Sequence, residues 1–181
     1  MTRQGFAIFA AALAIACGCA PGAMAQDNDD APAITARVHG TFLDKTGGLG
    51  VLSGDMTVLR FEVRSGTVTA IGRIVGSLAD SAGQLLGLVK QDLALPVGNV
   101  ASTCNQLRMD LAATDAVVLE TLVHFDGEVA GFDSRDGATP KALGVLCAAG
   151  ELLRGQPSPE AVARALDAVA VAVKARSQGK R

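Results

Sequence analysis

The stretch DMTVLRFEVRSGTVTAIGRIVGSL, residues 55–78, decides the fold class. Its first half alternates in the way that is typical of a strand with one buried face. The residues Ser65 and Gly66 then form a short polar link to a second β-prone run, so the stretch predicts a hairpin. One predicted strand face carries Thr57, Leu59, Phe61 and Val63, and the other carries Val58, Arg60, Glu62 and Arg64.

Similar runs flank this hairpin on both sides. The Asp126–Gly127 pair is expected to form a further hairpin turn. Short strands separated by Gly-rich turns predict a mainly β protein, an antiparallel barrel or sandwich of about 6–7 short strands. The remaining predicted strands are residues 34–43, 85–97, 104–112, 117–125 and 129–132.

The periodicity changes to a helical one after residue 137. Behind Pro140, Leu143, Leu146 and Cys147 recur at helical spacing. A second helix begins with Ser158 as N-cap, Pro159 in the first turn and then Glu160. The fold class is therefore α+β, with two C-terminal helices after the sheet. The second helix would pack on the sheet through Val162, Leu166, Val169 and Val173.

The first 25 residues have the features of an export signal. Arg3 precedes an apolar run, residues 6–16, that is too short to span a bilayer. Ala23 and Ala25 are small residues at the −3 and −1 positions of a cleavage site. An alternative is lipoprotein processing with an anchor on Cys17. We expect a secreted or periplasmic protein with no transmembrane segment in the mature chain.

The 181 residues suit a single domain. After the signal peptide, residues 1–25, the acidic residues 26–32 are expected to form a disordered leader. Residues 33–176 would form one β-rich domain with C-terminal helices. The polar residues 177–181 would form a frayed tail.

Cleavage after Ala25 would leave two of the four cysteines, Cys104 and Cys147. An even number of cysteines in an exported protein predicts a disulfide. A redox or metal pair is the alternative, but no C-x-x-C spacing supports it.

The composition disfavours several classes of partner. A net charge of −2 provides no strong field for nucleic acid or an anionic membrane. The chain has six Phe but no Trp or Tyr, so few rings are available to stack on bases or to cage quaternary amines.

The sequence predicts no catalytic residue, no cofactor site and no metal site. A general base at His124, served by Asp126 or Glu120, is the strongest enzymatic hypothesis, although no G-x-S-x-G motif accompanies it. Zinc ligation by His39 and His124 lacks a local ligand cluster. The glycines of residues 46–50 fit neither a P-loop nor a dinucleotide fingerprint.

Several residues together give the chain a resemblance to a known group. They are Gly40-Thr41-Phe42, Leu59-Arg60-Phe61, the turn at residues 80–83, Cys104 with Leu107, Met109 and Leu111, and Cys147. In this order they resemble small secreted bacterial proteins of unknown function, over about residues 33–153. The resemblance implies a secreted β-rich domain with one disulfide and implies no activity. The chain departs from that pattern at residues 112–114, which lack a Gly-Pro turn, and in the added helix after Ser158.

Three functional hypotheses follow, and a non-enzymatic exported domain leads them. The first is binding of a small apolar molecule, because small β-barrels enclose apolar cavities. The second is a structural or interaction module that contacts a cell-envelope protein. The third is a hydrolase using His124 and a carboxylate.

Overall fold

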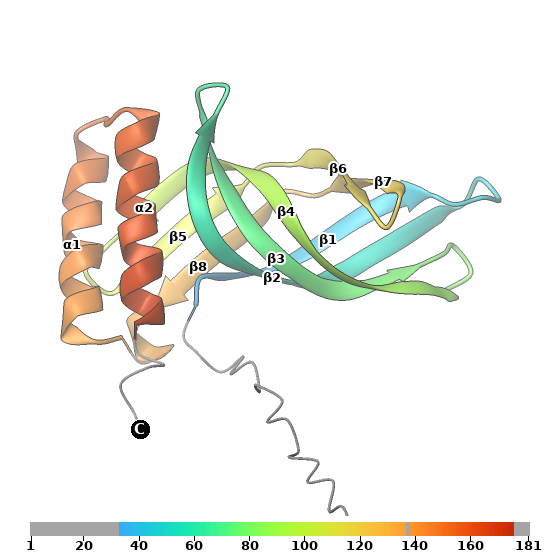
Figure 1. Ribbon diagram of the computed structural model, residues 1–181, viewed down its shortest axis with the longest axis horizontal. Helices are drawn as coiled ribbons and strands as arrows, with labels where there is room; N and C mark the ends of the chain where they lie inside the picture. Colours follow the sequence, from blue (N-terminus) through green and yellow to red (C-terminus); the bar gives the residue numbers. More distant parts are fainter. Residues whose placement is uncertain (1–32, 137, 176–181) are drawn as a thin grey trace, which may run out of the picture.

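The computed structural model describes residues 33–136 and 138–175. The predicted signal peptide with Ala23 and Ala25, the alternative lipidation site Cys17, the leader at 26–32 and the tail at 177–181 lie outside the described residues. The described chain is mainly β, with an antiparallel sheet followed by two helices, as predicted (Figure 1). The strands are β1 (Thr35–Leu43), β2 (Leu49–Arg64), β3 (Thr67–Ala79), β4 (Leu85–Ser102), β5 (Gln106–Leu111), β6 (Thr114–Val118), β7 (Thr121–Phe125) and β8 (Glu128–Asp133). A single 3₁₀ turn (Ser134–Asp136) leads to α1 (Pro140–Arg154) and α2 (Pro159–Lys174).

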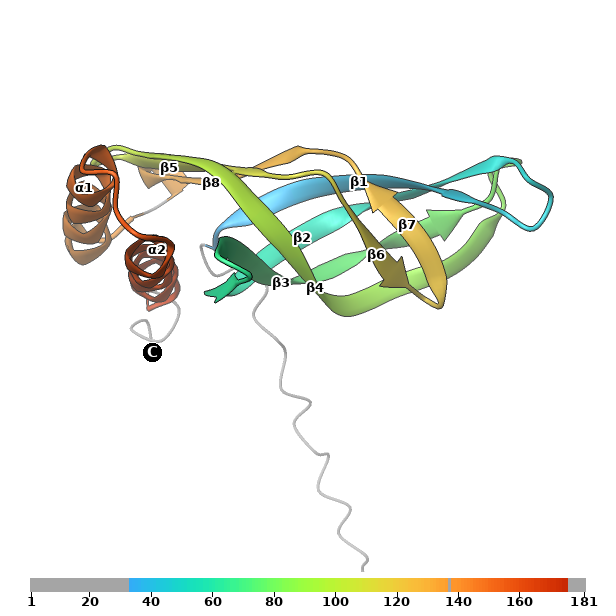
Figure 2. The same cartoon turned by 90° about the horizontal axis from the view of Figure 1, so that it is seen from above.

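The strands form one sheet whose pairings close into a ring. Their order is β2-β3-β4-β5-β8-β1-β7-β6, and β1 also pairs with β2 (Figure 2). β5 and β6 continue each other along one path, because Leu111 opposite Glu128 and Thr114 opposite Phe125 keep the same register. The ring therefore has six strand paths, which are longer than the short strands expected from the sequence.

The predicted hairpin turn at Asp126–Gly127 is wrong. The strands on either side of it, β7 and β8, both pair with β1 and so follow one another along the same edge. The turn lies instead at Leu119 and Glu120, both with positive φ (46° and 66°), between the paired residues Val118 and Thr121. Turn signals in sequence rest on Gly and Asn, which this turn lacks. The predicted strand over residues 117–125 therefore runs through a real turn.

The ring has a seam between β4 and β6. β4 pairs with β5 only in its second half, from Val97 to Ser102. Farther along the same path, the Gln91 side chain spans the gap, with Nε2 donating to the Val117 carbonyl at 2.9 Å. The amide of Leu119 donates to Gln91 Oε1 at 3.4 Å. One amide side chain thus takes the place of main-chain pairing at this position.

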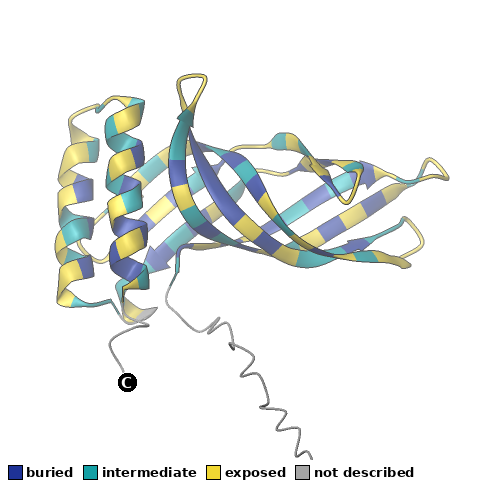
Figure 3. Cartoon of the chain, viewed as in Figure 1, coloured by how far each residue is buried: buried dark blue, intermediate teal, exposed yellow. Residues whose placement is uncertain are grey.

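The core fills the ring interior and extends under the helices. Leu52, Met56 and Ile74 are fully buried in it. A β-bulge between Val58 and Arg60 turns Val58 inward beside Phe61, against the strict alternation predicted for this strand. Figure 3 shows the resulting alternation of buried and exposed bands along the strands.

The helices lie together at one end of the ring (Figure 1). Thr139 and Ser158 cap them as N-cap residues, each followed by proline. Beyond its pairing with β1, which ends at Thr57, β2 packs against α2. There Asp167 Oδ1 accepts a hydrogen bond from the Phe61 amide at 2.6 Å. A helix side chain therefore covers a strand edge that would otherwise be free to pair with another chain.

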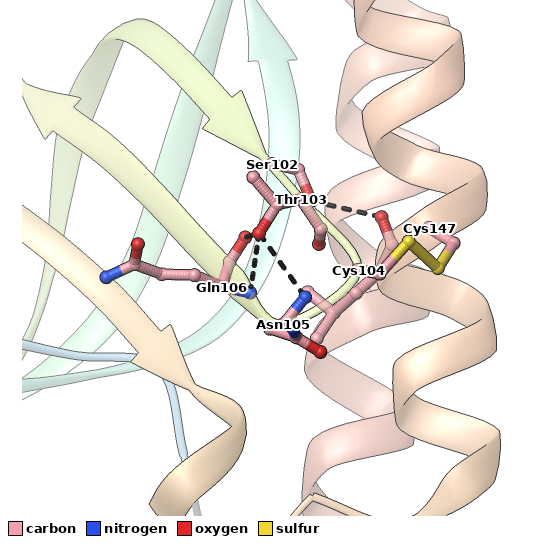
Figure 4. The surroundings of a disulfide bond; sticks show 7 residues. Ser102, Thr103, Cys104, Asn105, Gln106 and Cys147 are labelled. Atoms are coloured by element: carbon pink, nitrogen blue, oxygen red, sulfur yellow. Dashed lines mark hydrogen bonds between the residues drawn. A yellow bond between two sulfur atoms is a disulfide. The ribbon is translucent and has the colours of Figure 1, made fainter.

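The predicted disulfide is present. Cys104, in the turn between β4 and β5, is bonded to Cys147 on α1 (Figure 4). Beside it, Ser102 Oγ donates to the Leu146 carbonyl at 3.1 Å. Gly150 allows the close approach, because a Cβ there would lie 2.6 Å from the Ser102 carbonyl oxygen. The bond thus clamps α1 onto the end of β4.

Candidate distal interaction surface

Exposed aliphatic side chains gather on the outer surface of the ring at the end far from the helices. Leu43 is 72% exposed, Leu49 64%, Leu122 62% and Val117 60%. Val51, half exposed, adjoins them on β2. We call these five residues the distal face. Their exposed area is roughly 500 Å², which is in the upper part of the range of roughly 300–600 Å² for the largest apolar patch of a monomer.

Strand register brings these residues together. Leu43 is opposite Leu49 in the β1–β2 pair, and Val117 is opposite Leu122 in the β6–β7 pair. The two hairpins join where Thr41 is opposite His124, which places Leu122 next to Leu43. Because alternate residues of a strand share a face, all four aliphatic side chains point outward in one row. The distal face therefore spans four neighbouring strands.

A shallow groove of about 460 Å³ runs over this face. Its volume falls within the range of small-molecule sites, but the three leucines that line it, Leu43, Leu49 and Leu122, are each more than 60% exposed to solvent. Small-molecule sites bury most of the ligand surface, which this open groove cannot do. Its lining residues are Thr41, Phe42, Leu43, Leu49, Asp115, Thr121, Leu122 and His124.

His124 lies at the polar side of the groove. Its Nδ1 is 2.7 Å from Asp115 Oδ1, and both side chains are more than half exposed. The carboxylate partner is therefore Asp115 on β6, and not Asp126 or Glu120 as the sequence suggested. The aspartate of a hydrolytic triad is buried where it orients the histidine. The exposed pair is typical of a cross-strand surface contact.

The second histidine makes a similar contact. His39 Nδ1 on β1 lies 2.8 Å from Glu128 Oε1 on β8. The two histidines thus sit on neighbouring paths of the ring, each with its own carboxylate. Within residues 33–136 and 138–175, no group of three or more His, Cys, Asp or Glu residues could hold a metal ion.

Asp44 joins two of the loops at this end. Its carboxylate accepts hydrogen bonds from the amide and hydroxyl of Thr46, from the Gly48 amide, and from the amide and hydroxyl of Ser81. The Ser81 hydroxyl, followed by the Thr46 hydroxyl and the backbone amides, lowers the pKa of Asp44 well below its usual range. A charged Asp44 therefore holds the β1–β2 and β3–β4 loops together.

The β6–β7 turn is strained at the edge of the distal face. A positive φ is unusual for leucine and glutamate, and strain of this kind concentrates at functional sites. The Gln91 contacts described above hold the turn, and Leu119 Cδ1 lies only 3.0 Å from where a Cβ on Gly87 would be. The turn thereby presents Glu120 to solvent beside the aliphatic row.

The ring interior is filled where glycines could have left space. The Phe42 ring lies against Gly50, and Met56 lies against Gly72. Side chains of six strand paths complete the filling. This packing gives no support to an apolar ligand inside the ring.

A second groove of about 540 Å³ lies at the helical end. It runs from the β2–β3 turn past Asn99 on β4 to Gln156 and Pro157 in the α1–α2 link. None of the described residues that line it is charged. It therefore offers less chemistry for recognition than the distal face.

No protein family matches the chain, and no curated protein or solved structure shows significant similarity to it. In the described part of the chain, neither helix combines the length and apolarity needed to cross a membrane.

Proposed function

We propose that the chain is an exported, non-enzymatic interaction module that docks a segment of another protein on its distal face. The observation that carries the proposal is the row of aliphatic side chains across four adjacent strands. Apolar patches in the upper part of the size range for monomers are often functional.

The openness of the groove favours a protein over a small apolar molecule as the partner. A small ligand needs walls that enclose it, whereas a protein partner brings its own surface to cover the exposed leucines. The core side chains packed inside the ring also support a partner that binds on the outer surface. These two observations rank the interaction module above the small-molecule binder.

Export is part of the proposal and is supported by the disulfide. The Cys104–Cys147 bond persists where the surroundings are oxidising, as in the periplasm or outside the cell. Cleavage after Ala25 would place the folded domain in such a compartment.

Site-specific photocrosslinking in the producing cell tests this function. A photoreactive phenylalanine derivative would replace Leu122 on the distal face or, as a control, the 69% exposed Val171 on α2. We expect a protein adduct of discrete mass from position 122 that is lost when Leu43→Ser is added, and none from position 171. Equal adducts from both positions, or none from position 122, would contradict the proposal.

A further inference from the structure

The charges around the distal face are unbalanced. Three segments surround it: residues 43–49, 79–85 and 115–124. Together they hold four carboxylates and a single lysine, Lys45, although the whole chain has a net charge of only −2. The carboxylates are Asp44, Asp80, Asp115 and Glu120.

Three of these carboxylates lie close to the apolar row. Asp115 lines the groove itself, and Asp44 directly follows the exposed Leu43. Glu120 projects from the turn between Val117 and Leu122. Hydrogen bonding keeps Asp44 ionised. The distal face is thus an apolar strip with an acidic rim.

We infer that the distal face docks an apolar segment of a partner protein that carries lysine or arginine side chains. The inference rests on the proposed function and adds the chemistry of the partner. Complementary charges at the rim of an interface speed association and discourage wrong partners. Rim carboxylates would meet basic side chains while the aliphatic row covers the apolar ones.

The same rim argues against two other occupants. A second copy of the chain, docked face to face, would bring two acidic rims together, and like charges across an interface are unfavourable. An anionic membrane surface would be repelled for the same reason. A polypeptide segment with both apolar and basic side chains is the occupant that complements the aliphatic row and the acidic rim.

Two fluorescent probe peptides test the inference on the disulfide-bonded protein by fluorescence anisotropy. One alternates leucine with lysine, and the other alternates leucine with glutamate, so that only the charge differs. We expect the lysine peptide to bind about tenfold more tightly, because the rim carboxylates attract its basic side chains and repel the carboxylates of the glutamate peptide. The preference should shrink in high salt, which screens exposed charges.

Four variants locate the binding. Leu122→Ser should abolish binding of the lysine peptide, whereas Val171→Ser, at a 69% exposed position on α2, should leave it unchanged. The double variant Asp115→Asn/Glu120→Gln should lower the preference for the lysine peptide over the glutamate peptide without abolishing binding. The control Glu151→Gln, at an exposed position on α1, should leave this preference unchanged.

The outcomes separate this inference from the proposed function. If both peptides bind equally at a site that Leu122→Ser destroys, the charge inference is overturned and docking on the distal face stands. If neither peptide binds, or if Leu122→Ser has no effect, both are overturned. A preference for the glutamate peptide would also overturn the inference.

Discussion

Two glycines on one helix should respond in opposite ways to the same substitution. In Gly150→Ala the new Cβ would lie 2.6 Å from the Ser102 carbonyl oxygen and 3.2 Å from its carbon. To remove this overlap, α1 and the end of β4 must move apart by about 1 Å, and overpacking of this kind costs about 1–3 kcal/mol. The shift also stretches the hydrogen bond from Ser102 to Leu146, worth about 1 kcal/mol. Alanine returns about 1 kcal/mol through its better helix propensity.

The net expectation for Gly150→Ala is a loss of about 1–3 kcal/mol in the free energy of unfolding. Gly144 on the same helix is exposed, and a Cβ there meets no atom within 4 Å. Gly144→Ala should therefore stabilise the protein by about 0.5–1 kcal/mol. Urea unfolding with the disulfide intact measures both. The account of how α1 docks on β4 is refuted if Gly150→Ala is as stable as the unchanged protein, or if both variants shift in the same direction.

Three further predictions concern the β6–β7 turn, the hydrogen bond between Asp167 and the Phe61 amide, and the Asp44 carboxylate that joins two loops. Glu120→Gly should stabilise the protein by about 0.5–1 kcal/mol in thermal unfolding by relieving a positive φ. Gly66→Ala, at φ 77°, should destabilise it, and the same sign for both would refute the strain argument. Asp167→Ala should cost about 1–2 kcal/mol by leaving the Phe61 amide unpaired, whereas Asp167→Asn should retain most of the stability; equal losses in urea unfolding would contradict this. Asp44 has a pKa below that of an unfolded aspartate. The stability that its ionised carboxylate contributes is therefore present above about pH 4 and is lost as the pH falls through the folded pKa. Amide hydrogen exchange in residues 44–48 and 80–84 should accelerate in Asp44→Asn. Unchanged protection would contradict the claim that Asp44 holds these two loops together.

Much of the fold could be predicted from local pattern. The hairpin at Ser65–Gly66, the capped helix after Ser158 and the Cys104–Cys147 bond are all confirmed. Each has a local signal: a Gly turn, a Ser-Pro-Glu start, and the pair of cysteines that lie outside the predicted export signal.

The sequence-based predictions are wrong where the regular alternation of a strand is interrupted by a feature that no characteristic residue marks. The bulge after Val58 reverses the alternation, and the Leu119–Glu120 turn has neither Gly nor Asn. As a result Val117 and Leu119 are exposed, although Val123 and Phe125 at alternate positions of the predicted strand are buried. Asp126–Gly127 marks an irregularity along one strand path rather than a hairpin.

The candidate site could not be predicted, because it depends on which strands become neighbours. Leu43 and Leu122 are far apart in the chain, and only the β1–β7 pairing places them together. The His124–Asp115 contact depends in the same way on the register of β6 and β7. Exposed leucines look like core residues in a sequence until the strand order is known.

Amide chemical-shift mapping by NMR, with the leucine–lysine peptide added to the full domain, tests the central claim most directly. The account predicts shifts confined to residues 41–49 and 115–124, with the interior residues Met56 and Ile74 and both helices unchanged. Shifts centred on the ring interior or on the groove beside Gln156, or no shifts at all, would contradict the claim that this protein works through its distal face.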